Sequence, residues 1–138
     1  MRILFLGDVV GISGYSKIIN NLLRQIEINK IDFVVLNAEN ADVSGVGLTK
    51  KICEDFFKCG VDVITTGNHV WDQKEIMNFI DKENRLLRPK NLFEPSPGKG
   101  FEIYKTSKNK KIGVLNLMGN VFMKKCDDVF EVSKKFLD

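Results

Sequence analysis

Residues 3–8 read ILFLGD, four apolar side chains followed at once by a glycine and an aspartate. A short, unbroken apolar run of this kind predicts a β-strand that is covered on both faces, as in a parallel sheet. An amphipathic helical pattern follows over residues 18–26, and residues 33–36 (FVVL) form a second buried run. Strand, helix and strand in this order predict an α/β fold with parallel strands and right-handed crossovers.

The alternation continues beyond the second strand. A helical stripe predicts a second helix, and its four inward side chains are Ile52, Cys53, Phe56 and Phe57. Gly60 has the C′ position at the end of this helix. Residues 61–65 predict a third strand. Asp72 then has the position of an N-cap in a capping box over residues 72–75, which predicts a short helix that buries Ile76, Phe79 and Ile80.

The last third of the chain predicts a hairpin and a final helix. Residues 101–105 and 112–117 are apolar enough for two strands, and they flank a lysine-rich turn that we interpret as a solvated hairpin tip rather than a binding patch. Residues 129–136 have helical periodicity. We therefore expect residues 1–138 to form a single α/β domain with a mostly parallel sheet and flanking helices.

Composition narrows the class of protein. The chain has 138 residues, 43% of them hydrophobic and 28% charged, which is typical of a globular domain. Its net charge of +3 is too small to indicate nucleic-acid binding, and no apolar run approaches the length of a membrane span. The three cysteines form no C-x-x-C pair, so we expect reduced, structural thiols. Asp8 interrupts the first apolar run and no signal-peptide cleavage site follows, so we expect a cytoplasmic protein.

Polar residues follow each of the first three strands: Asp8 after the first, residues 37–40 (NAEN) after the second and residues 67–69 (GNH) after the third. Singly, each has an ordinary interpretation as a loop, turn or core residue. Together they are expected to meet, because ligands of open α/β sheets gather at the carboxyl ends of the strands. Two carboxylates in one cleft favour a cation, and carboxylate and amide oxygens suit Mn²⁺, Mg²⁺ or Fe²⁺.

In these three motifs the chain resembles the calcineurin-like metallophosphoesterases. Residues 7–11, 37–41 and 67–72, with Arg88-Pro89 and residues 97–100, resemble more narrowly the bacterial subgroup related to 2′,3′-cyclic-nucleotide 2′-phosphodiesterases. The resemblance implies the N-terminal half of a metallophosphoesterase-type αββα sandwich. It also implies hydrolysis of a cyclic nucleotide or a related phosphodiester with two divalent ions, Mn, Fe or Mg.

The resemblance assigns a role to five residues. Asp8 and Asn40 would hold one ion, Glu39 would bridge the two ions, and Asn68 would bind the second. His69 would protonate the leaving oxygen or steady the phosphoryl group. The common Asp-x-His motif is replaced by residues 8–10 (DVV), and a glutamate takes the place of the usual bridging aspartate.

Relatives in this subgroup continue further and supply three more histidine ligands, whereas His69 is the only histidine here. We therefore expect an N-terminal portion of a metal-dependent phosphodiesterase, with little activity alone and with an uncovered sheet edge and apolar face. One alternative is a non-catalytic metal- or nucleotide-binding protein that covers this face by forming a homo-oligomer. Another is a different nucleotide-binding domain that cradles phosphate at residues 11–14 (GISG).

Overall fold

The computed structural model describes residues 1–93 and 95–137, and its centre is a parallel four-stranded sheet. The strands are β1 (Ile3–Leu6), β2 (Phe33–Asn37), β3 (Val63–Thr65) and β4 (Leu86–Leu87), in that spatial order. All three pairings are parallel. The predicted α/β class is confirmed, and β4 is an addition, because two residues are too few for a pattern.

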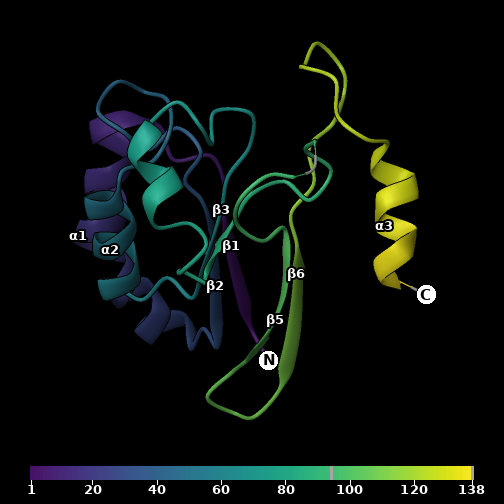
Figure 1. Ribbon diagram of the computed structural model, residues 1–138. Helices are drawn as coiled ribbons and strands as arrows, with labels where there is room; N and C mark the ends of the chain where they lie inside the picture. Colours follow the sequence, from purple (N-terminus) through teal and green to yellow (C-terminus); the bar gives the residue numbers. More distant parts are fainter. Residues whose placement is uncertain (94, 138) are drawn as a thin grey trace.

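Helices α1 (Gly11–Asn29) and α2 (Lys50–Lys58) cover one face of this sheet (Figure 1). Their apolar sides bury a core in which Phe56, Leu36 and Ile64 have no exposed surface. The Thr49 hydroxyl accepts the Ile52 N–H at the start of α2. The helix ends as predicted, because Gly60 follows its last turn with a φ of +99°, which favours glycine.

A hairpin of β5 (Phe101–Lys105) and β6 (Lys111–Leu115) packs on the other face, over β2 to β4. The second core lies between the sheet and this hairpin, and its members are Phe33, Val35, Val63, Leu87, Tyr104, Ile112 and Val114. The last helix, α3 (Val129–Leu137), packs outside the hairpin, with the Phe101 and Phe136 rings 4.9 Å apart. The lysine-rich turn is an exposed hairpin tip, as predicted.

The prediction that the first strand is covered on both faces is wrong. Ile3 and Phe5 are 49% and 64% exposed. The reason is topological: β1 lies at the edge of the sheet, and the hairpin packs on Phe33, Val35, Val63 and Leu87 of β2 to β4.

The predicted capping box is also wrong. Residues Lys74–Asn78 form a 3₁₀ turn, η1, whose preceding residue is Gln73 and which has no side-chain cap. Asp72 instead turns its carboxylate toward His69. The predicted burial holds for Ile76 and Ile80, and Phe79 is half-buried.

The cysteine prediction holds, since Cys53, Cys59 and Cys126 are buried and unpaired. Burial raises the pKa of the Cys53 thiol to about 12, which is typical of a buried structural cysteine. Among the described helices, none is long and apolar enough to cross a membrane.

Candidate metal and phosphoryl site at the strand ends

Backbone hydrogen bonds join the loops that follow β1, β2 and β3. The Val9 N–H donates to the Asn37 carbonyl at 3.0 Å, and the Ala38 N–H donates to the Thr65 carbonyl at 3.0 Å. The Gly11 N–H donates to the Asn40 carbonyl at 2.8 Å. These bonds hold the three loops together at the carboxyl end of the sheet, as the sequence predicted.

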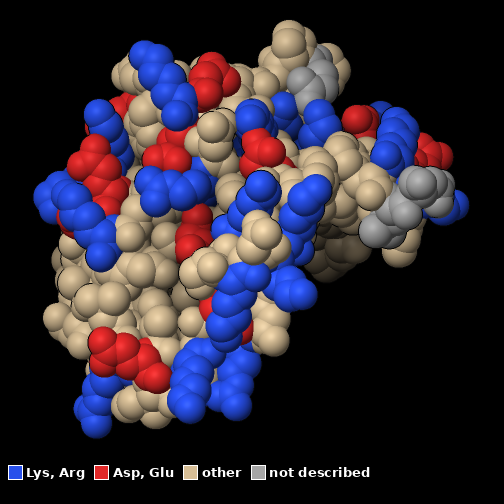
Figure 2. All heavy atoms as spheres, turned by 90° about the horizontal axis from the view of Figure 1, so that it is seen from below, with Lys and Arg blue, Asp and Glu red and all other residues tan. Residues whose placement is uncertain are grey.

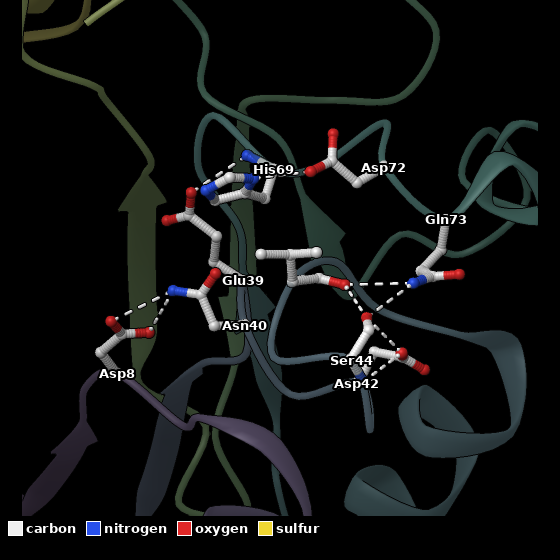
Figure 3. A network of polar contacts seen from close by, with 9 residues as sticks. Asp8, Glu39, Asn40, Asp42, Ser44, His69, Asp72 and Gln73 are labelled. Atoms are coloured by element: carbon white, nitrogen blue, oxygen red, sulfur yellow. Dashed lines mark hydrogen bonds and ion pairs between the residues drawn. The ribbon is translucent and has the colours of Figure 1, made fainter.

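Asp8 and Asn40 meet across two of these loops. The Asn40 amide donates to both Asp8 carboxylate oxygens, at 3.1 and 3.2 Å (Figure 3). Asp8 is exposed and Asn40 is half-buried, so their polar atoms border solvent. Rotation of the amide by half a turn would place its oxygen beside the carboxylate, where a cation would find two oxygen ligands.

Glu39 extends from the same loop toward the loop after β3. Its Oε1 accepts the backbone N–H of His69 at 3.1 Å. The carboxylate also lies directly against Gly67: a Cβ atom at this position would be 1.9 Å from Oε2 and 2.3 Å from Cδ. Only glycine leaves room for the carboxylate here, so the glycine of the GNH motif has a steric role that spacing alone did not reveal.

His69 forms a pair with Asp72. The imidazole Nδ1 and Asp72 Oδ2 are 2.6 Å apart, both side chains are partly exposed, and the Asp72 N–H donates to the His69 carbonyl. With Nδ1–H donated to the carboxylate, the other ring nitrogen is the one left to face a ligand. Sequence reasoning missed this role of Asp72, although a carboxylate three residues after a histidine in a turn is a signal for such a pair.

A second polar network supports the loop that carries Glu39. The Asp42 carboxylate accepts from the Ser44 N–H and hydroxyl, and the Gln73 amide donates to the Val46 carbonyl and to the Ser44 hydroxyl. Burial raises the pKa of Asp42, but hydrogen bonds from Ser44 and from the Val43 N–H outweigh it and hold the pKa below its ordinary value. Asp42 is therefore a structural acid that anchors the loop.

Asn68 belongs to the same loop as Gly67 and His69, and its side chain is half-buried. Among the described residues, no hydrogen bond joins this side chain to Asp8, Glu39 or Asn40. Direct contacts thus join Asp8 to Asn40 and Glu39 to His69, and Asn68 is placed beside His69 by the chain alone.

The oxygen donors of Asp8, Glu39, Asn40 and Asn68 are of the type that binds a hard divalent cation, but they are few. Two carboxylates and the amide oxygens of two asparagines are the ligands that Mg²⁺ or Mn²⁺ prefers. Within residues 1–93 and 95–137, however, no group of three histidine, cysteine, aspartate or glutamate side chains is poised to hold a metal. One ion with water in its remaining positions fits this set, and a cage for two ions does not.

Known proteins match this chain over nearly its whole length. It is 44% identical over 130 residues to 2′,3′-cyclic-nucleotide 2′-phosphodiesterase of Bacillus subtilis. The aligned residues cover 94% of this chain and 48% of that protein. It is 37% identical to a putative phosphatase/phosphodiesterase of Mycoplasma pneumoniae, over 86% of this chain and 43% of that protein. The chain thus spans about half the length of these relatives.

Two solved structures also match nearly all of this chain and about half of their own length. A hypothetical protein from Thermus thermophilus superimposes with a TM-score of 0.90 and 34% identity, over 99% of this chain and 52% of that chain. A phosphatase from Mycoplasma pneumoniae superimposes with a TM-score of 0.88 and 34% identity, over 99% of this chain and 50% of that chain.

The model of the YmdB-like protein family matches residues 4–138, which include every site residue described above. The chain therefore belongs to the YmdB-like protein family, within the metallophosphoesterase superfamily.

Proposed function

We propose that this chain carries part of the active site of a metal-dependent phosphodiesterase that acts on cyclic nucleotides or related phosphodiesters. The observation that carries the proposal is that two contacts span the loops at the carboxyl ends of β1 to β3. Asn40 bonds to Asp8, and Glu39 accepts the backbone N–H of His69, whose ring pairs with Asp72. The names of the relatives support the reaction class, and the name of the Bacillus subtilis relative supports a 2′,3′-cyclic nucleotide as substrate.

A bound Mn²⁺, Mg²⁺ or Fe²⁺ ion would supply Lewis-acid stabilisation of the phosphoryl oxygens. Asp8, Glu39, Asn40 and Asn68 are the residues that would hold metal, and Glu39 is the one placed between the loops. His69 would bind the phosphoryl group or give a proton to the leaving oxygen as the P–O bond breaks. Asp72 would keep its ring oriented for this transfer.

The first test is metal binding by the 138-residue chain. We expect Mn²⁺, followed by electron paramagnetic resonance, to bind weakly and with one ion per chain, and 2′,3′-cyclic AMP to be hydrolysed slowly or not at all. Robust Mn²⁺-dependent turnover that Asn68→Ala abolishes would show that the chain is a complete enzyme. Absence of any Mn²⁺ binding would refute the proposed metal site.

The second test is a chimeric protein in which this chain replaces the matched half of the Bacillus subtilis relative. Hydrolysis of 2′,3′-cyclic AMP is expected, and Glu39→Gln is expected to remove it. A chimera that folds, binds Mn²⁺ and yet hydrolyses no phosphodiester would contradict the proposed reaction while leaving the metal site intact.

The small number of described ligands favours one competing function, a non-catalytic protein that binds metal or nucleotide through the same residues. It predicts that Mn²⁺ strengthens nucleotide binding to this chain, and that the chimera binds 2′,3′-cyclic AMP without turnover. The product analysis of the chimera therefore separates the two functions.

A further inference from the structure

An open pocket lies at the carboxyl end of β4, and the segment after this strand, the start of β5 and the end of α3 line it. Its volume is about 360 Å³, a size typical of pockets that hold small ligands. The lining includes residues from the Arg88-Pro89 motif and from residues 97–100 (PGKG). Neither motif contributes a side chain to the candidate metal site, so their role lies elsewhere.

Hydrogen bonds and close packing fix the wall of this pocket. The Arg88 guanidinium is 2% exposed and donates to three backbone carbonyls. These belong to Pro89, Ser96 and Pro97, at 2.9, 3.1 and 3.0 Å. Gly100 lies directly against Lys90, because a Cβ at position 100 would be 2.4 Å from the Lys90 Cα. Arg88 therefore holds the two motifs together and shapes the pocket.

The lining is cationic. Arg88, Lys90 and Lys99 all contribute to it, and none of the lining residues that the structure describes carries a carboxylate. Glu102 of β5 pairs with Lys99 from outside this lining, with its Oε2 2.5 Å from Nζ. A lysine ammonium has three donors, so Lys99 is able to contact an anion while it keeps this partner. Lysine is also a common phosphate ligand in proteins, which favours a phosphate group here.

Two aromatic rings complete the lining. The rings of Phe101 and Phe136 lie 4.9 Å apart, inclined at 46°, and both side chains are only half-buried. Partly exposed aromatic rings beside cations are a surface on which nucleic-acid bases stack, because every base has a flat π face. The pocket thus offers charge for a phosphate and rings for a base.

We propose that this pocket binds a nucleoside monophosphate. The phosphate lies against Lys90 and Lys99, the base contacts the rings of Phe101 and Phe136, and Arg88 is a positioning residue that holds the wall. The inference goes beyond the proposed function, since it uses none of the residues assigned to the metal site and requires neither metal nor catalysis.

The test is isothermal titration of the 138-residue chain with adenosine 5′-monophosphate in the presence of EDTA. We expect binding at one site per chain. Adenosine, which lacks the phosphate, and inorganic phosphate, which lacks the base, are each expected to bind more weakly. In proton–nitrogen NMR spectra, the nucleotide is expected to shift the amide signals of Gly98, Gly100 and Phe101 and to leave those of Gly67 and His69 in place.

Two lysine variants test the phosphate contact. Lys90→Gln and Lys99→Gln are each expected to weaken binding of adenosine 5′-monophosphate by about 10-fold, the cost of one hydrogen bond to a charged group. Lys105→Gln, which changes an exposed lysine of β5 that does not line the pocket, is the control and is expected to bind normally. Unchanged melting temperatures show that these variants fold.

One phenylalanine variant tests the base contact. Phe136→Ala is expected to weaken binding of adenosine 5′-monophosphate and to leave the affinity for inorganic phosphate unchanged. Phe130→Ala is the control, since Phe130 lies in the same helix, is 73% exposed and does not line the pocket.

Three results would overturn the proposal. The first is the lack of nucleotide binding in the presence of EDTA. The second is equal affinity for adenosine 5′-monophosphate and inorganic phosphate. The third is binding that both lysine variants leave unchanged, or that His69→Asn abolishes, which would place the nucleotide at the metal site instead.

Discussion

The carboxylates at the two ends of the parallel sheet differ in the charge of their partners. At the amino end, Asp32 accepts the Arg2 N–H and pairs with Lys108 from the hairpin tip, 2.6 Å away. At the carboxyl end, the described donors to Asp8 and Glu39 are neutral groups, the Asn40 amide and the backbone N–H of His69. Within the described residues, no lysine or arginine pairs with either of them.

We therefore interpret Asp32 as a structural acid, and Asp8 and Glu39 as acids that are available to a ligand. Figure 2 shows the molecule from below, with lysine and arginine side chains gathered in a band. Lys105, Lys108 and Lys110 of the hairpin tip are exposed, and Lys108 neutralises Asp32. A carboxylate without a protein cation costs stability when another carboxylate is near, and an external cation removes that cost. The two carboxylates at the carboxyl end are therefore available to a ligand, as the proposed metal site requires.

The largest expected effect comes from removing the charge of Glu39. Glu39→Gln keeps the shape and hydrogen-bonding oxygen of the side chain but takes away one of two carboxylates. We expect Mn²⁺ affinity to fall by about 100-fold, at the upper end of what changes around metal sites cost. Isothermal titration with Mn²⁺ measures this. Glu102→Gln, on the hairpin, is the control and should bind Mn²⁺ as the unmodified chain does; equal losses in both variants would contradict the assignment.

The next effect concerns proton transfer by His69. In the chimera with the Bacillus subtilis relative, His69→Asn is expected to lower kcat for 2′,3′-cyclic AMP by about 100-fold, the usual contribution of a general acid. Asp72→Asn should lower kcat by a smaller factor, because the ring remains but loses its orienting partner. Single-turnover kinetics check both. An Asp72→Asn loss as large as that of His69→Asn would show that the carboxylate itself is essential.

A smaller effect is expected from crowding Glu39. Gly67→Ala places a methyl group where the carboxylate lies and should weaken Mn²⁺ binding by about 10-fold through displacement of Glu39. Gly119→Ala is the matched control, since a Cβ there meets no atom within 4 Å. Combining Gly67→Ala with Glu39→Asp, a shorter carboxylate, should recover part of the affinity. No recovery would indicate that Gly67 acts through the loop backbone instead.

The smallest effect tests the amino end. The hydrogen bond from Lys108, helped by the Arg2 N–H, lowers the pKa of Asp32, so this acid stabilises the fold above its unfolded pKa of 3.8 and loses that contribution as the pH falls. Lys108→Met should therefore reduce the melting temperature at about pH 7 and change it less at about pH 3. Lys110→Met serves as the control. A Lys108→Met effect that grows toward low pH would contradict this pairing.

Local patterns in the sequence were sufficient for the alternation of strands and helices and for the prediction that three polar loops meet at the strand ends. Continuous apolar runs, a helical stripe and a C′ glycine report on the few residues around them, and the rule that parallel strands share a carboxyl end then brings Asp8, Glu39 and His69 together. The backbone bonds between the three loops agree with that expectation.

Other features required the tertiary structure, because they depend on residues that are distant in the chain. The exposure of Phe5 follows from which strands the hairpin covers, and the pairing of Asp72 with His69 follows from a turn that replaces the predicted helix. The need for glycine at position 67 arises only when Glu39, from another loop, lies against it. The sequence by itself determined the order of strands and helices and which polar loops share one end of the sheet. The tertiary structure decided the contacts between their side chains, since contacts across loops follow from the packing of whole elements.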